Sequence, residues 1–127
     1  MHGPAYGAQK AGTDKFARDM AVDFRPHNVA CISLWMGMLR TARSRAAMDR
    51  SPEAYAGLWD IAENPELTGL LIGRLFRDEQ RMAQSGTVWI GAELAQHYGL
   101  NDIDGRTPIS HREMLGAPPA AHPAVIE

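Results

Sequence analysis

The chain has 127 residues, of which 45% are hydrophobic and 22% charged, and its formal net charge is -2. These values are typical of a globular protein with a single core. They argue against a basic nucleic-acid-binding surface and against a polybasic membrane anchor. We expect no membrane span, because no apolar run approaches about 18 residues, and we recognise no signal peptide. The lone cysteine, Cys31, lies in an apolar run, which favours a buried thiol, a reducing compartment and hence the cytoplasm.

The first third of the chain predicts a long helix followed by a buried strand. Phe16, Met20 and Phe24 recur every four residues within 6–24, which is typical of one buried helical stripe, and Pro26 ends the helix. Residues 29–35 form a continuous apolar run of strand length. Such runs are typical of parallel strands buried on both faces, so the pattern indicates an α/β fold.

The remaining elements are marked by capping and turn residues. Residues 41–50 are either a short mobile helix or a solvated linker. Ser51-Pro52 and Asn64-Pro65 each predict a helix start. We expect a helix over 54–62, a second helix after Pro65, a strand over 87–90, a helix over 92–98, a turn over 101–106 and an irregular tail beyond Met114. The apolar face of the second helix is predicted to contain Leu67, Leu70, Leu71, Leu75 and Phe76.

Tyr6 and Lys10 stand four residues apart at the start of the first helix. Their side chains should leave the same helical face, one turn apart. An ammonium group beside a phenol stabilises the phenolate, so such a pair can exchange a proton near neutral pH. By spacing alone, a surface pair without a catalytic role is the favoured interpretation.

Other catalytic and binding motifs are missing from the sequence. The five histidines are scattered without paired spacing, and we expect no metal site. There is no GxSxG elbow for a serine nucleophile, and no GxGxxG or GxxxxGK[ST] loop for a phosphate. The stretch Asp102-Ile103-Asp104-Gly105-Arg106 lacks the length and the final glutamate of a calcium loop, so we expect a turn there.

The order Tyr6-Gly7-Ala8-Gln9-Lys10, apolar strand, Gly37 and Thr41 resembles the C-terminal half of a classical short-chain dehydrogenase/reductase. The later stretches 85–95 and 102–106 also resemble that family, and one branch of it in particular. The resemblance implies an α/β fold that is the C-terminal part of a Rossmann-like doubly wound parallel sheet. This sheet would be incomplete, and its elements would be a long helix, a buried strand, lid helices, and a last helix and strand. It implies a partial domain over 1–115 and an extended or disordered tail over 116–127.

The resemblance also implies residue roles. Tyr6 would be the general acid/base for a small carbonyl or alcohol substrate, and Lys10 would activate it and bind the nicotinamide ribose. Gly37 and Thr41 would contact the nicotinamide end of NAD or NADP. Residues 42–62 would form a substrate-binding lid, with a pocket lined by Met38, Leu39, Tyr55 and Trp59.

The sequence departs from the family pattern in two ways. Met36 stands where the family usually has proline, and the family's glycine-rich loop, catalytic serine and helper asparagine belong to segments that precede the tyrosine. Two hypotheses follow: a truncated NAD(P)-dependent oxidoreductase, or an inactive remnant that folds only by association with itself or another chain, for instance as a homo-oligomer. A third is an unrelated α/β binding module in which the Tyr–Lys pair is fortuitous.

Overall fold

The structure is a computed structural model that describes residues 3–120 and 124. In chain order the elements are α1 (Pro4–Phe24), η1 (Arg25–His27), β1 (Ser33–Trp35), α2 (Ala42–Arg50), α3 (Pro52–Asp60), α4 (Pro65–Arg77), η2 (Arg81–Gln84), β2 (Val88–Ile90), α5 (Gly91–His97) and α6 (Arg112–Leu115). No helix in this described part is long and apolar enough to cross a membrane.

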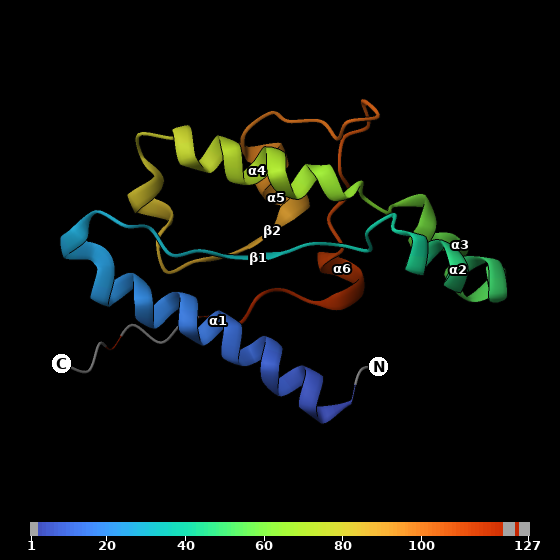
Figure 1. Cartoon of the computed structure of the whole chain (residues 1–127), viewed down its shortest axis with the longest axis horizontal. Helices are drawn as coiled ribbons and strands as arrows, with labels where there is room; N and C mark the ends of the chain where they lie inside the picture. The colour runs from blue at the N-terminus through green and yellow to red at the C-terminus, as the bar shows by residue number, and fades with distance from the viewer. Residues whose placement is uncertain (1–2, 121–123, 125–127) are drawn as a thin grey trace.

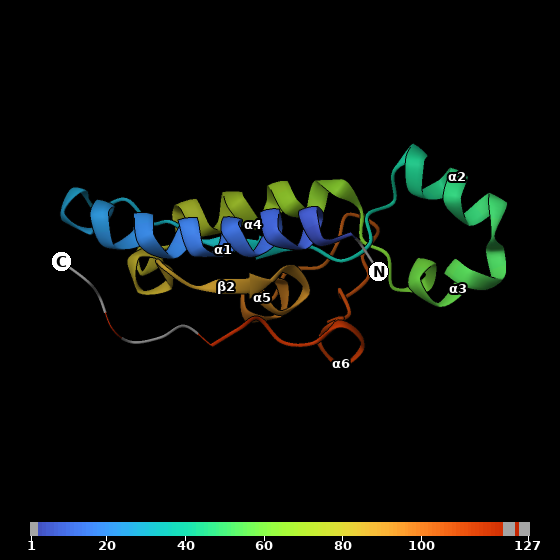
Figure 2. The same ribbon diagram turned by 90° about the horizontal axis from the view of Figure 1, so that it is seen from below.

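The two strands pair in parallel and have helices on both faces. Ser33 lies opposite Val88, and Trp35 opposite Ile90. α1 covers one side of the pair and α4 the other (Figures 1 and 2). Parallel strands need a long crossover connection, which α2, α3 and α4 provide here. This confirms the predicted incomplete Rossmann-like α/β fold.

The ends of α1 follow its proline residues. Gly3 is the N-cap, and Pro4 occupies the first helical turn, where its missing N–H is not needed. The helix ends at Phe24, since η1 contains Pro26 and leads to Asn28 in the left-handed region at φ 55°. The predicted helix is therefore confirmed, and it begins two residues earlier than its pattern indicated.

Later helix starts fall where the sequence predicts them. Ser51 and Asn64 are the N-cap residues of α3 and α4, but neither side chain makes a capping hydrogen bond. The side-chain amide of Asn64 instead donates to Asp104 at 3.1 Å. Residues 42–50 are helical, which decides between the two alternatives for that stretch. The short helix α6, which ends where the predicted irregular tail begins, was not expected.

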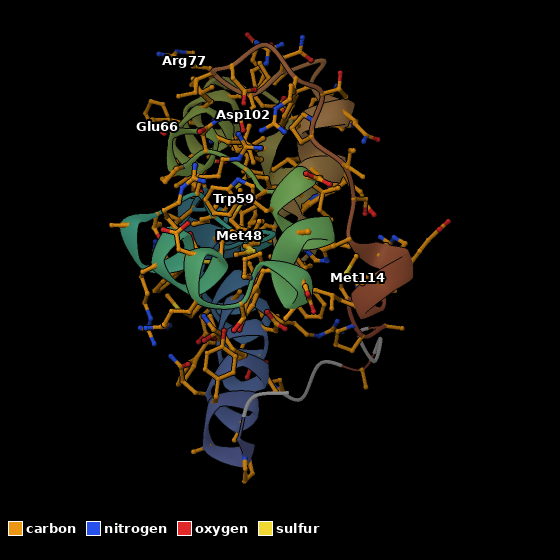
Figure 3. The ribbon with its side chains drawn as sticks, turned by 90° about the vertical axis from the view of Figure 1, so that its right-hand side faces the viewer. Met48, Trp59, Glu66, Arg77, Asp102 and Met114 are labelled. Carbon is orange, nitrogen blue, oxygen red and sulfur yellow. The ribbon has the colours of Figure 1, made fainter. Side chains whose placement is uncertain are left out.

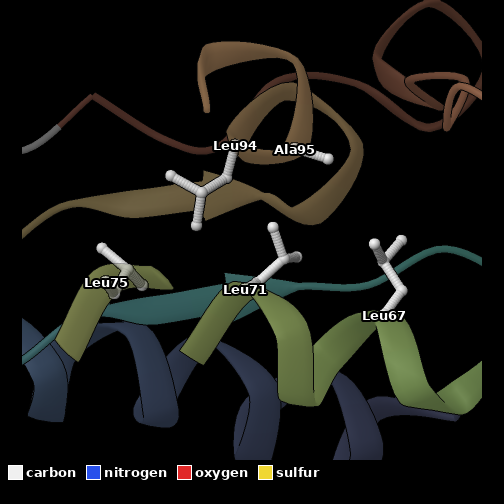
Figure 4. Packing of buried hydrophobic residues seen from close by; sticks show 5 residues of the cluster. All are labelled: Leu67, Leu71, Leu75, Leu94 and Ala95. Carbon is white, nitrogen blue, oxygen red and sulfur yellow. The ribbon is translucent and has the colours of Figure 1, made fainter. Parts of the chain in front are cut away.

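The core lies between α4 and α5. Leu67, Leu71 and Leu75 form a buried stripe on α4 and pack against Leu94 and Ala95 of α5 (Figure 4). The prediction was wrong for two other members of that face. Leu70 is 43% exposed and Phe76 is 78% exposed, because α5 covers only the narrow stripe and Phe76 points away from it.

β1 is shorter and more exposed than its apolar run predicted. Only three residues form the strand, and among them only Ser33 is buried. Val29 is 46% exposed and Cys31 is half-buried. Within the described residues β1 pairs with β2 alone, so its other edge has no neighbouring strand and the run stays partly exposed.

Asp14 attaches α1 to β1. Its carboxylate accepts hydrogen bonds from the Ser33 hydroxyl at 2.6 Å and from the Trp35 indole N–H at 3.0 Å. Asp14→Ala should lower the free energy of unfolding by about 1–3 kcal/mol, because it leaves two donors without their acceptor. Asp19→Ala is the matched control, since Asp19 pairs only with exposed Lys15 on the same helix and should change stability little. Urea denaturation measures both variants, and equal losses would contradict this role of Asp14.

Candidate active site

Tyr6 and Lys10 come together on the first turns of α1. The Lys10 Nζ atom lies 5.5 Å from the centroid of the Tyr6 ring, which is within the range of a cation–π contact. The Tyr6 side chain is 46% exposed. The predicted pairing of the two side chains is therefore present, at a surface that a substrate can reach.

Three parts of the chain lie toward one end of the molecule. The N-terminal end of α1, the segment after β1 and the α2–α3 hairpin all lie on the right of Figure 1. The carboxyl ends of both strands face this end, which is where open α/β sheets bind ligands. Lys10, Asp14 and Trp35 line an open groove of about 1500 Å³ along α1, to which β2 and the C-terminal segment also contribute. Tyr6 is not among the described residues that line this groove.

The loop formed by residues 36–41 follows β1 and leads into the lid. Thr41 is the N-cap of α2: its Oγ1 accepts the Ser44 N–H at 3.2 Å, and its own N–H donates to Ser44 Oγ at 2.8 Å. Met38 and Leu39 are half-buried. The loop thus brings the predicted cofactor residues Gly37 and Thr41 close in space to two of the predicted substrate residues.

Glu63 is a site residue that sequence reasoning missed. It is 2% exposed, and its Oε2 atom accepts the Gly37 N–H at 2.9 Å. Burial raises the pKa of this carboxyl above its ordinary value, the Gly37 N–H opposes that shift, and the negative charge of Asp102 adds to it. In the sequence, Glu63 is marked only as a charged residue between an apolar helix and Asn64-Pro65. That pattern is too common to predict a functional site.

Met36 replaces the family's proline, and Gly91 accommodates it. A Cβ atom built on Gly91 would lie 2.5 Å from the Met36 sulfur. The thioether therefore occupies the space that any larger residue at the start of α5 would need. Met36 thus packs directly against the first residue of α5, where proline would have offered only a restricted φ.

The α2–α3 hairpin, which corresponds to the predicted lid, is held by cation–π contacts. The Cζ atoms of Arg45 and Arg40 lie 4.2 Å and 5.6 Å from the centroid of the Trp59 ring. Figure 3 views the molecule from this end, with Trp59 and Met48 between the two helices. Tyr55 is half-buried on α3. Trp59 thus packs within the lid itself, and substrate contact by Tyr55 and Trp59 stays a prediction.

Tyr98 is unsuited to acid/base work. Its hydroxyl donates to Asp78 Oδ2 at 2.6 Å, and burial together with this carboxylate raises the pKa of Tyr98 to about 12. The group therefore stays protonated far above neutral pH. Its role is to attach the end of α5 to the end of α4.

Cofactor and metal sites can be assessed from the residues present. Within residues 3–120 and 124, no group of three His, Cys, Asp or Glu side chains could hold a metal ion. Contact of Lys10 and of the loop around Gly37 with a nicotinamide dinucleotide stays a prediction, and the Gly37 N–H already donates to the Glu63 carboxylate at 2.9 Å.

Three features define the class of protein. They are a helix that starts with Tyr-x-x-x-Lys, a pair of parallel strands, and a loop with Gly37 after the first strand. Over most of its length the chain is homologous to short-chain dehydrogenases/reductases, which supports the C-terminal part of such a protein. It is 35% identical over 113 residues to human Dehydrogenase/reductase SDR family member 1, covering 84% of this chain and 36% of that protein. It is 34% identical over 123 residues to the mouse protein of the same name, covering 91% of this chain and 39% of that protein. The chain thus spans little more than a third of the length of these relatives, and no family model matches it.

Proposed function

We propose that this chain supplies the proton-transfer pair and the substrate lid of an NAD(P)-dependent oxidoreductase that interconverts carbonyl compounds and alcohols. The observation that carries the proposal is the contact of Lys10 Nζ with the Tyr6 ring, 5.5 Å from its centroid, on a chain whose relatives are short-chain dehydrogenases/reductases. The working unit is the partial domain of residues 1–115. We place it in the cytoplasm, since its one cysteine indicates a reducing compartment.

Tyr6 acts as the general acid in reduction. Its O–H donates a proton to the carbonyl oxygen while the carbonyl carbon accepts a hydride, and in the reverse direction the phenolate removes the proton from the alcohol. Lys10 places a positive charge beside the phenolate that remains after proton transfer. A bound nicotinamide dinucleotide would supply the hydride in one direction and accept it in the other.

The remaining site residues have binding roles in this proposal. Lys10, Gly37 and Thr41 hold the nicotinamide end of NAD or NADP. The half-buried side chains of Met38 and Leu39, together with Tyr55 and Trp59 of the lid, line the substrate pocket. This composition favours a substrate with an apolar body around its carbonyl group.

The 127-residue chain by itself should not bind NADH or NADPH saturably below millimolar concentration. The reason is that its sequence contains no GxGxxG loop to hold the pyrophosphate. Titration of the purified chain with NADH or NADPH, followed by nicotinamide fluorescence, measures the dissociation constant. The same titration of the protein as expressed from its own gene is the comparison. Micromolar binding with turnover by the 127 residues would show that they form a complete enzyme and would contradict the prediction.

The alternative function is that of a non-catalytic remnant that folds by association. The exposed apolar side chains of α1 favour it, because Phe16 is 70% exposed, Val22 44% and Phe24 37%. Faces of this kind are usually covered by another part of the protein or by a second copy. Turnover by the protein as expressed from its own gene would rule out this alternative.

A further inference from the structure

Glu63 touches the 36–41 loop at three successive points. Its carboxylate accepts the Gly37 N–H at 2.9 Å, its own N–H donates to the Met38 carbonyl at 2.9 Å, and its carbonyl accepts the Arg40 N–H at 2.8 Å. Leu39 and Glu63 form an isolated parallel bridge. One residue thus joins the backbone that enters the lid to the backbone that leaves it.

The 102–106 turn holds the same segment from the other side. The Asp102 carboxylate accepts the Asn64 N–H at 2.7 Å. The Arg106 guanidinium donates to the Asp60 carbonyl at 3.0 Å and to the Ala62 carbonyl at 3.1 Å. The backbone on both sides of Glu63 is therefore fixed by two charged side chains of a single turn.

The turn is also linked to the loop. The Asp104 carboxylate accepts the Arg106 Nε–H at 2.9 Å and lies 3.7 Å from the Arg40 guanidinium. In Figures 1 and 2 the α2–α3 hairpin stands away from the rest of the molecule. The position of the lid relative to the sheet therefore depends on the short segments at its base.

We propose that Glu63 is a positioning residue for the proposed oxidoreductase. It fixes the Gly37 backbone at the nicotinamide end of the site and joins the two ends of the lid, and the 102–106 turn holds Glu63 in place. We call the contacts of Glu63 with the 36–41 loop, together with those of the 102–106 turn around Glu63, the brace. The brace is a property of the chain, and its role in catalysis rests on the proposed function.

The burial of the carboxylate is consistent with a role in positioning. Its second oxygen, Oε1, is buried without a hydrogen-bond partner, which costs stability. Gly37 has no Cβ, and one built there would lie 3.4 Å from the Glu63 carboxyl carbon. The carboxylate therefore packs directly against the loop backbone, at a distance where a Cβ on residue 37 would make ordinary van der Waals contact with it.

The pH dependence of the brace has a definite sign. The pKa of Glu63 is raised in the folded chain above its ordinary value of 4.5, so folding favours the protonated form. The contribution of Glu63 to the free energy of unfolding is fully present below pH 4.5, the ordinary pKa. It is lost as the pH rises through the raised pKa of the folded chain. The charged groups that line the same small cavity as Glu63 are Asp60, Asp102 and Arg106.

Amide hydrogen exchange, followed by NMR on the purified chain, tests the brace without any cofactor. Glu63→Leu removes the acceptor, so the Gly37 amide should exchange roughly tenfold to a hundredfold faster. Glu63→Gln retains an oxygen acceptor and should restore most of the protection. Glu66→Leu is the control, since Glu66 is exposed in the first turn of α4. Unchanged Gly37 exchange in folded Glu63→Leu would overturn the proposal.

Two further measurements keep the proposal testable if Glu63→Leu fails to fold. Arg106→Lys should speed exchange at the amides of Glu63 and Arg40, because a single ammonium group cannot reproduce the forked contact with two carbonyls. The unfolding free energy of the wild type should fall relative to that of Glu63→Gln as the pH rises above the ordinary carboxyl value. Unchanged exchange in Arg106→Lys would overturn the brace, and parallel pH profiles would contradict the raised pKa of Glu63.

Kinetics separate the brace from the proposed function. In the protein as expressed from its own gene, Glu63→Leu should raise KM for NADH or NADPH more than it lowers kcat, because the defect lies in the position of the loop, and Glu63→Gln should restore most of the wild-type KM. If the wild type shows no turnover while Gly37 exchange still depends on Glu63, the proposed function fails and the brace stands. If the wild type turns over and neither KM nor exchange responds to Glu63, the brace fails and the function stands.

Discussion

Tyr6→Phe is expected to lower nicotinamide-dependent carbonyl reduction by a factor on the order of 10²–10⁴, which is the range for loss of a general acid/base. The protein to assay is the one expressed from its own gene, and the measurement is the rate of NADH or NADPH oxidation. The thermal midpoint should stay the same, because the Tyr6 side chain is 46% exposed and the substitution keeps its ring.

Tyr98→Phe is the matched control for that prediction. It removes one phenolic oxygen in the same way, but this oxygen donates to Asp78 at 2.6 Å and attaches α5 to the end of α4. The thermal midpoint of this variant should fall while its turnover stays near that of the wild type. Turnover retained in Tyr6→Phe would remove Tyr6 from its proposed role.

Leu71→Ala should be the most destabilising of the simple core truncations. Leu71 is fully buried at 0% exposure and sits at the centre of the α4–α5 cluster. Truncation of such a leucine typically costs about 2–5 kcal/mol, against a total stability of roughly 5–15 kcal/mol for an ordinary domain. We expect a large fall in the urea midpoint, or loss of the cooperative transition.

The neighbouring residue gives the control for this second prediction. Leu70 is 43% exposed on the same helix, so Leu70→Ala makes the same change in composition and helix propensity without opening a cavity. Its effect on the urea midpoint should be small. Equal effects of the two substitutions would contradict the position of the core between α4 and α5.

Local signals made most of the helices predictable. Proline in a first turn, preceded by glycine, serine or asparagine, marks the starts of α1, α3 and α4, because those positions suit proline for reasons within a few residues of chain. The Tyr6–Lys10 contact was predictable for the same reason, since helical spacing alone brings positions four apart together.

Interactions between distant segments were not predictable. The extent of β1 depends on which strands lie beside it, and the run of residues 29–35 has the composition of a fully buried strand although it pairs with β2 alone among the described residues. The exposure of Leu70 depends on the reach of α5, which the sequence of α4 does not contain. Tertiary context of this kind overrides local propensity.

The parts of the candidate site differ in the same way. Tyr6, Lys10, Gly37 and Thr41 carry a pattern that can be read along the chain. Glu63 has none, because it contacts Gly37 from 26 positions further along the chain and is held by a turn still further along. Its contribution is visible only once the loop, the base of the lid and the turn are placed in space.

The most direct test of the central claim is the turnover of the protein as expressed from its own gene. The assay supplies NADH or NADPH with a panel of apolar ketones and aldehydes, and compares the wild type with Tyr6→Phe. We expect nicotinamide oxidation matched by alcohol formation in the wild type and its loss in the variant. Equal rates in both proteins, or no turnover of any carbonyl by the wild type, would contradict the assignment of Tyr6 as the acid/base of an oxidoreductase.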